Sequence, residues 1–205
     1  MKVNLEQVCK RYISEWVFKN INYSWQGPGV HAILGANGSG KSTLLRMIAG
    51  MQTISKGRIS YELDGKVVVA DQIFNHVSYC APAMDIIEEM SLREFLSFHF
   101  SFKKIRKGWT VDNIISALGM QAVQHKYIAD YSSGMKQRAK LAQAFFADTP
   151  LLLLDEPCSN LDLPGVTLYQ DWLRSLAHDR LVIVASNDER EYLEARTKLD
   201  IQAYK

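Results

Sequence analysis

The sequence predicts an α/β fold: a core with a mostly parallel sheet, an antiparallel β edge subdomain, and a small helical subdomain at about 85–130. Three observations support this prediction. A glycine-rich segment at 35–43 lies between an apolar strand and a helical pattern. An apolar run at 151–154 is followed directly by two acids, as at the end of a buried parallel strand. The N-terminal residues and 58–70, with a turn at Asp64-Gly65, have the pattern of antiparallel strands.

The glycine-rich segment fits the phosphate-loop pattern G-x-x-x-x-G-K-[ST] at every required position. It comprises Gly35, Ala36, Asn37, Gly38, Ser39, Gly40, Lys41, Ser42 and Thr43. Glycines allow successive N–H groups to converge on a phosphate at the positive end of the following helix. Lys41 is expected to add a charge toward the β- and γ-phosphates, Ser42 to ligate Mg²⁺, and Thr43 to support the phosphate. The segment therefore predicts the P-loop core of a nucleoside triphosphatase.

The apolar run that ends in Asp155 and Glu156 predicts a central parallel strand with its carboxyl end at the site. Asp155 is then placed to hold the shell of Mg²⁺. Glu156 is placed to polarise the attacking water as a general base. Beside the phosphate loop, this pair indicates hydrolysis of the bound nucleotide.

Between these two motifs lies Tyr131-Ser132-Ser133-Gly134-Met135-Lys136-Gln137-Arg138, followed by a helical pattern. This segment resembles the signature motif of ATP-binding cassette (ABC) ATPases, usually Leu-Ser-Gly-Gly-Gln. Ser132 and Gly134 match, while Ser133 replaces the first glycine and Met135 the glutamine. The resemblance implies the ABC ATPase fold, and it implies that Ser132, Ser133, Gly134 and Met135 bind the ATP held by the opposite subunit.

Two further segments resemble the family, so that the resemblance covers nearly the whole chain. Ser159-Asn160-Leu161-Asp162 resembles the D-loop, which implies that Asp162 couples two cassettes across their interface. Tyr12 occupies the place of the aromatic that stacks on adenine, and Tyr23 and Trp25 are the alternatives.

The chain departs from the family at two positions near the γ-phosphate. Pro82 or Ala83 takes the place of a glutamine that touches Mg²⁺ and water, and neither side chain can ligate a metal. Asn187 takes the place of the switch histidine; it can donate a hydrogen bond but cannot carry the proton of a histidine. We therefore expect normal ATP binding and slow hydrolysis, with Glu156 and Asn187 as the catalytic residues.

Length, charge and cysteine spacing narrow the classes of protein to which the chain can belong. The chain has 205 residues, which suits a single ATP-binding domain over 1–205, and its formal charge of +2 does not indicate a nucleic-acid partner. Cys9, Cys80 and Cys158 lack the paired spacing of a metal site, which favours a reduced cytosolic chain. No segment has the length and apolarity of a membrane span. A basic cluster at 103–107 is expected to be a solvated loop.

The resemblance implies a subunit of an ABC transporter whose cofactors are ATP and Mg²⁺. Two copies, or this chain and a second cassette, would close around the nucleotide and drive a transmembrane permease subunit. The location would be cytoplasmic, on the inner face of the membrane through that partner. Two alternatives stay open: a hydrolysis-deficient switch that responds to nucleotide occupancy, and a soluble ABC ATPase without a membrane partner. Steady-state turnover and capture of a membrane partner distinguish them.

Overall fold

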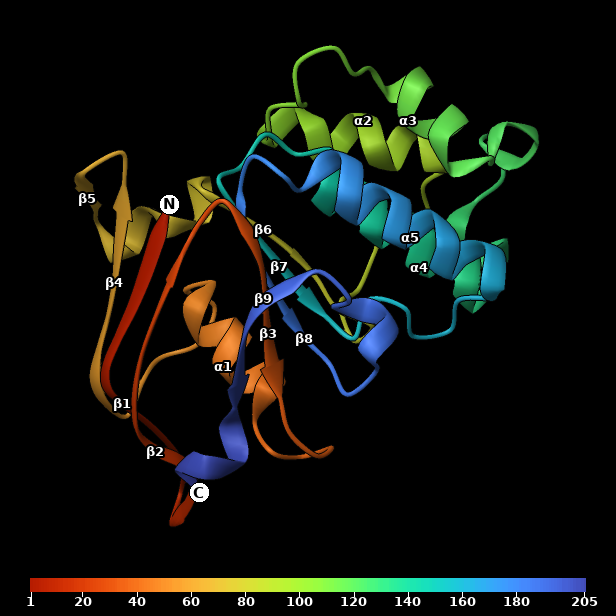
Figure 1. Cartoon of the computed structure of the whole chain (residues 1–205). Coiled ribbons are helices and arrows are strands. Elements are labelled where there is room, and N and C mark those ends of the chain that lie inside the picture. Colours follow the sequence, from red (N-terminus) through yellow and green to blue (C-terminus); the bar gives the residue numbers. More distant parts are fainter. The chain divides into compact units, whose positions relative to one another are not determined.

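The chain divides into two compact units in a computed structural model that describes all of residues 1–205. The first unit comprises Met1–Tyr79, Thr149–Glu156 and Ala177–Lys205. The second comprises Cys80–Asp148 and Pro157–Leu176. Both sheets belong to the first unit and most of the helical turns to the second (Figure 1). The predicted α/β class, with parallel, antiparallel and helical parts, is confirmed.

An antiparallel sheet forms one side of the first unit, with strand order β2-β1-β4-β5. Its strands are β1 (Lys2–Tyr12), β2 (Glu15–Gln26), β4 (Lys56–Leu63) and β5 (Lys66–Val68). Val3 pairs with Trp25 on one neighbour and with Tyr61 on the other, and all three side chains are buried. The predicted turn joins β4 to β5, because Asp64 and Gly65 both have the positive φ that a two-residue hairpin requires.

The second sheet of this unit has the order β6-β7-β8-β3-β9, and its pairs β7–β8, β8–β3 and β3–β9 are parallel. The strands are β3 (Gly29–Leu34), β6 (Val77–Cys80), β7 (Leu151–Asp155), β8 (Leu181–Ala185) and β9 (Ala195–Asp200). Every residue of β7 and β8 is buried, which explains why both strands are uninterrupted apolar runs. Loops that leave β3, β7 and β8 therefore emerge at one edge of the sheet.

Helix α1 (Lys41–Ile48) connects the two sheets through the hydrophobic core (Figure 1). Leu44, Leu45 and Ile48 are fully buried in one cluster with side chains from both sheets. Truncating such a leucine to alanine typically costs about 2–5 kcal/mol of unfolding free energy. The core thus fixes the N-terminus of α1, which is the end that faces the loop at 35–40.

The second unit is built from α2 (Leu92–Phe102), α3 (Val111–Leu118), α4 (Ser133–Phe145) and α5 (Leu163–Leu176). Ser91 and Glu94 form a reciprocal capping box that starts α2. Helix α5 packs on α4, with Tyr169 and Trp172 against Phe145. The unit therefore extends past the helical lobe expected at about 85–130, because the helix of the signature-like motif belongs to it.

The three cysteines are buried and form no disulfide. No helix combines the length and the apolarity that a membrane span requires.

His99 in α2 is partly buried, with its Nε2 atom fully enclosed, and its pKa lies at about 4. Burial disfavours its cation, and the neighbouring charge of Lys103 acts in the same direction. Since the unfolded chain binds this proton near pH 6.5, the unfolded state holds more protons between pH 6.5 and 4. His99 therefore leaves the folded state unaffected above pH 6.5 and destabilises it as the pH falls toward 4.

We predict that His99→Leu reduces the loss of unfolding free energy between pH 7.5 and 5 by about 1–2 kcal/mol. Urea unfolding at the two pH values measures this difference. The exposed His125 is the matched control for removing an imidazole, and the change in His99→Leu is compared with that in His125→Leu. Equal pH dependence in His99→Leu and wild type would contradict the assignment.

Candidate nucleotide site

The phosphate loop connects β3 to α1, as the sequence predicts. Gly35, Gly38 and Gly40 have φ values of 146°, 76° and 106°, a region that side chains with a Cβ rarely adopt. Lys41 is only 4% exposed, and its Nζ donates to the carbonyl oxygens of Gly35 at 2.7 Å and Ala36 at 3.3 Å. The loop therefore holds a buried ammonium group at the N-terminus of a helix, where an anion is stabilised by the helix dipole as well.

A pocket of about 420 Å³ opens over this loop. It is lined by Tyr12, Val17, Asn37, Gly38, Gly40, Lys41, Ser42, Thr43, Arg46 and Glu156. This volume suits a small polar ligand, and the lining places a cation, hydroxyl groups and a carboxylate around it. All of these residues belong to the first unit, so the pocket is complete within it.

Tyr12 is 47% exposed and forms an aromatic wall of this pocket. Gln52 donates a hydrogen bond to its hydroxyl group, and this bond lowers the pKa of Tyr12. The Nζ of Lys10 lies 5.0 Å from the ring centroid. By contrast, Trp25 is fully buried and the hydroxyl of Tyr23 donates to Thr197, and neither lines the pocket.

The acid pair at the end of β7 meets the N-terminus of α1. The hydroxyl of Ser42 donates to Oδ1 of Asp155 at 3.0 Å, and the hydroxyl of Tyr79 donates to Oδ2 at 3.4 Å. Asp155 is 5% exposed, and burial raises the pKa of its carboxyl group, with a further rise from the charge of Glu156. A cation beside this carboxylate would compensate for the burial of its charge.

The donor set fits Mg²⁺. Ser42 and Asp155 offer only oxygen atoms, and no group of three or more His, Cys, Asp or Glu side chains forms a metal cage. Mg²⁺ is typically held in this way, by one or two protein groups while phosphate and water oxygens complete the octahedron. The pair therefore suits a metal ion that arrives with a nucleotide.

Glu156 and Asn187 lie at the same edge of the sheet. The backbone N–H of Glu156 donates to the carbonyl of Ala185 at 2.9 Å, and Glu156 has a positive φ of 42°. Its side chain lines the phosphate-loop pocket. Nδ2 of Asn187 donates to Oδ1 of Asn37 at 3.0 Å, so Asn187 contacts the phosphate loop directly.

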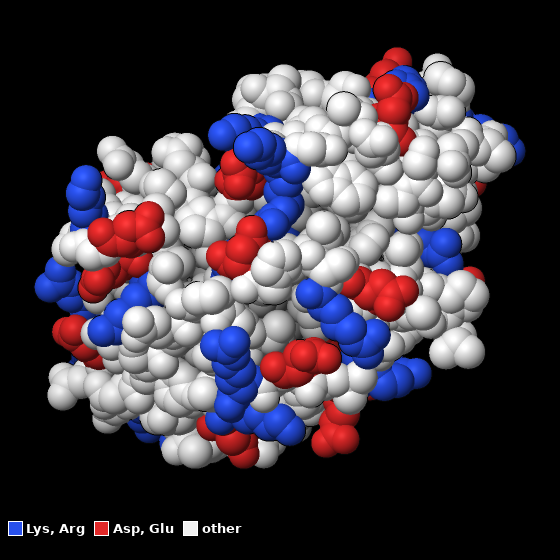
Figure 2. Space-filling view, turned by 45° about the horizontal axis from the view of Figure 1, so that its top comes forward, with Lys and Arg blue, Asp and Glu red and all other residues white.

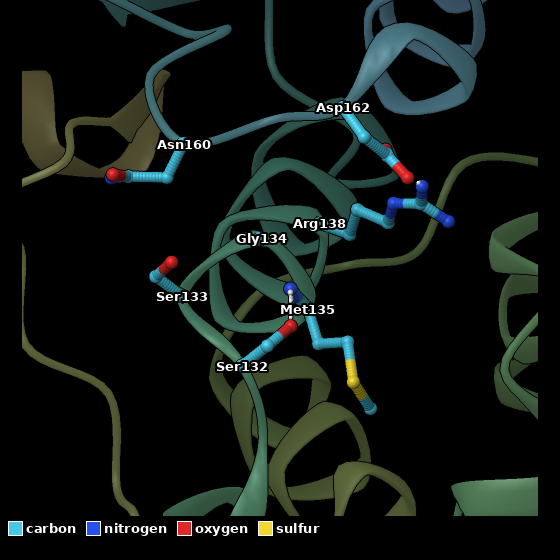
Figure 3. A pocket seen from close by; sticks show the side chains of 7 residues that line it. All are labelled: Ser132, Ser133, Gly134, Met135, Arg138, Asn160 and Asp162. Carbon is cyan, nitrogen blue, oxygen red and sulfur yellow. Dashed lines mark hydrogen bonds and ion pairs between the residues drawn. The ribbon is translucent and has the colours of Figure 1, made fainter.

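The signature-like residues line a second pocket of about 370 Å³ within the helical unit (Figure 3). Its lining comprises Ser132, Ser133, Gly134, Met135, Arg138, Asn160 and Asp162. Ser132 caps α4 by accepting the N–H of Met135 at 3.3 Å, as Figure 3 shows. The motif and the D-loop-like segment, about 25 residues apart in sequence, thus share one pocket.

Comparison with known proteins places the chain in a family. The model of the family described as "ABC transporter" matches residues 18–159. The chain belongs to the ABC transporter family. An uncharacterised ABC transporter ATP-binding protein of Bacillus subtilis is 30% identical over 90% of this chain, and a sulfate/thiosulfate import ATP-binding protein of Nocardia farcinica is 33% identical over 83%. The chain spans 61% and 53% of the lengths of these relatives.

Solved ABC structures have the same fold. A putative ABC transporter ATP-binding protein from Pyrococcus furiosus superposes with a TM-score of 0.82 at 22% identity, covering 100% of this chain and 99% of that one. A dimeric cassette in a post-hydrolysis state with ADP and phosphate gives 0.82 at 20% identity, covering 97% and 94%. The similarity extends over both units of the cassette.

Several pocket residues of this ABC cassette carry no sequence signal of their own. The sequence patterns around Tyr79 and Arg46 predict a strand and a helix but give neither residue a role in the site. In the structure Tyr79 donates to Asp155, and Arg46 lines the pocket. Gln52 follows α1 and reaches Tyr12. Their roles depend on tertiary placement. Pro82 and Ala83 lie in the helical unit, and the carbonyl of Pro82 accepts a hydrogen bond from Lys140 at 2.6 Å.

We predict that Gly40→Ala weakens ATP binding by at least about 10-fold, measured by calorimetric titration. A Cβ at Gly40 would lie 2.5 Å from Cγ1 of Val17, at a φ of 106°. Gly38→Ala is the matched control, because its Cβ would meet nothing within 4 Å and only its φ of 76° is unfavourable. Its loss should stay below about 5-fold, and equal losses in both variants would contradict the steric argument.

Proposed function

We propose that this cassette is the ATP-binding and hydrolysing subunit of an ABC transporter, closing as a dimer around ATP to drive a transmembrane partner. One observation supports the proposal above the others. A single pocket contains the phosphate loop, the Ser42–Asp155 contact and the carboxylate of Glu156. Relatives named as ATP-binding proteins of ABC transporters add support, including import proteins for sulfate or thiosulfate.

Each pocket residue has a role in this proposal. The N–H groups of residues 35–43 and the ammonium of Lys41 bind the phosphates, and Tyr12 stacks on adenine. Ser42 and Asp155 would hold Mg²⁺, which would neutralise charge on the phosphate oxygens when bound. Glu156 accepts a proton from the attacking water, which is consistent with its position in the pocket. Asn187 donates a hydrogen bond to the γ-phosphate from its place beside Asn37.

The second pocket supplies the other half of the site in the proposed dimer. Residues 132–135 of one subunit close on the γ-phosphate of ATP bound by the other, with Asp162 coupling the two. The partner cassette is either a second copy or a different cassette that supplies the missing groups. A permease subunit would keep the cassette at the cytoplasmic face of the membrane. The dimeric cassette with ADP and phosphate shows an assembly that this fold adopts.

Pro82, Ala83 and Asn187 favour one alternative, a switch that binds ATP and hydrolyses it poorly. Loss of one transition-state contact commonly costs about 2.7–4 kcal/mol, or about 10²–10³ in rate. The proposal therefore expects slow rather than absent turnover, since Glu156 is in place and Asn187 can donate.

Glu156→Gln should reduce ATP turnover by at least about 10²-fold, because an amide cannot accept the proton from water. The dissociation constant for ATP should change less than about 3-fold, because Lys41 and the loop are retained. Phosphate release with Mg²⁺ and a binding titration give the two quantities. Glu62→Gln, on an exposed position of β4, is the control. Tight binding without turnover in the wild type would favour the switch.

Asn187→His should raise turnover by about 10-fold with little change in ATP affinity. An imidazole restores a group that carries a proton beside the γ-phosphate, which an amide cannot do. Single-turnover hydrolysis at saturating ATP measures the change. Unchanged turnover would show that position 187 does not limit the reaction.

A further inference from the structure

The segment Pro157–Asp162, which follows Glu156 in the chain, is held by one face of α4. Gly134, Gln137 and Arg138 are spaced i, i+3 and i+4, and such residues lie on the same side of a helix. Each of the three meets a different point of the segment. All of these residues belong to the second unit.

Gln137 makes the first contact. Its side chain is 2% exposed, and Nε2 donates to the carbonyl oxygen of Pro157 at 2.8 Å. A buried carbonyl without a partner is costly, so this bond stabilises one conformation of the peptide directly after Glu156.

Gly134 makes the second contact by having no side chain. A Cβ at this position would lie 2.9 Å from the carbonyl oxygen of Asn160. Asn160 itself has a positive φ of 64°. Position 134 has the glycine of the family's signature motif, since a side chain there would meet Asn160. Position 133 has serine in place of the motif's other glycine, and this side chain is exposed.

Arg138 makes the third contact (Figure 3). Its Nη2 donates to Oδ1 of Asp162 at 2.6 Å, and the same oxygen accepts the N–H of Gly165 at 3.0 Å. These donors hold the pKa of Asp162 below its usual range, with Arg138 the larger cause. A charge-assisted bond of this length, shared with a helix cap, defines the position of the carboxylate.

We propose that Gln137 and Arg138 are positioning residues: they clamp residues 157–162 so that the second pocket is formed before a partner cassette arrives. The carboxylate of Asp162 is already bound to Arg138 and Gly165 of its own chain. Asp162 then couples the subunits by fixing the conformation of residues 157–162. This inference rests on the proposed function for its catalytic consequence. The clamp itself is a property of the single chain.

The surface carries charged side chains of both signs. Figure 2 shows basic and acidic side chains interspersed over the face drawn, with no extended patch of one sign. Arg138 has only 22% of its side chain exposed while that of Asp162 is 65% exposed. The largely buried side chain of Arg138 therefore restrains a mostly exposed carboxylate.

The test uses Arg138→Leu, Asp162→Asn, the double variant and Arg138→Lys in the full chain. Asparagine retains the cap of α5, since it is as good an N-cap as aspartate, and removes only the charge. Arg174→Leu is the matched control, because Arg174 forms an exposed ion pair with Asp171 on α5. Amide hydrogen exchange reports the clamp without any need for activity. Turnover and the ATP dissociation constant report its consequence.

We expect Arg138→Leu to speed exchange at residues 158–165 by about 10-fold or more, and Arg174→Leu to leave it unchanged. Turnover should fall by about 10-fold in Arg138→Leu, with the ATP dissociation constant within about 2-fold and partial rescue in Arg138→Lys. The double variant should be no slower than the slower single variant, since both act through one contact.

Unchanged exchange in Arg138→Leu would overturn the clamp. Faster exchange with unchanged turnover would overturn the positioning role. Effects that multiply in the double variant would show that Asp162 acts independently of Arg138. A wild-type protein with neither turnover nor ATP-driven dimerisation would instead refute the proposed function, and exchange would still decide the clamp.

Discussion

The hydrogen bond from Ser42 to Asp155 is the contact on which the nucleotide site depends. It joins the first turn of α1 to the carboxyl end of β7, two elements separated by more than 100 residues of sequence. The parallel sheet makes this contact possible, because β7, β8 and β3 are neighbours and release their loops at one edge. Burial of Asp155 favours a cation beside its carboxylate. The hydrophobic core around α1 fixes the N-terminus of α1 relative to the carboxyl end of β7.

The parts of the site that the sequence predicts are those that depend on contiguous residues. The phosphate loop needs fixed glycines between a strand and a helix, so its pattern predicts both the structure and the chemistry. The acid pair is equally local, since Asp155 ends a buried strand and Glu156 directly follows it. The fold class could be predicted from the phosphate loop and the acid pair together, and not from composition.

Contacts between distant segments could not be predicted in this way. Tyr79 reaches Asp155 because β6 lies next to β7, and Gln52 reaches Tyr12 because the segment after α1 is bonded to the end of β1. One of these bonds is from Nζ of Lys10 to the carbonyl of Thr53 at 2.7 Å. No periodic pattern in the sequence predicts either of these contacts. The helical unit is also larger than expected, because aromatic packing between α4 and α5 joins segments that β7 separates in the chain.

Glu156 connects the nucleotide site to the clamped segment through the backbone. One boundary between the two units falls between Glu156 and Pro157, directly after the proposed base. Glu156 has a φ of 42°, and a residue held in such a conformation persists only where neighbouring contacts maintain it, at a cost of about 1–3 kcal/mol. The bond from its N–H to Ala185 maintains it from one side, and the bond from Gln137 to Pro157 restrains the next peptide. How well this one backbone position is held therefore decides where the carboxylate of Glu156 lies in the pocket.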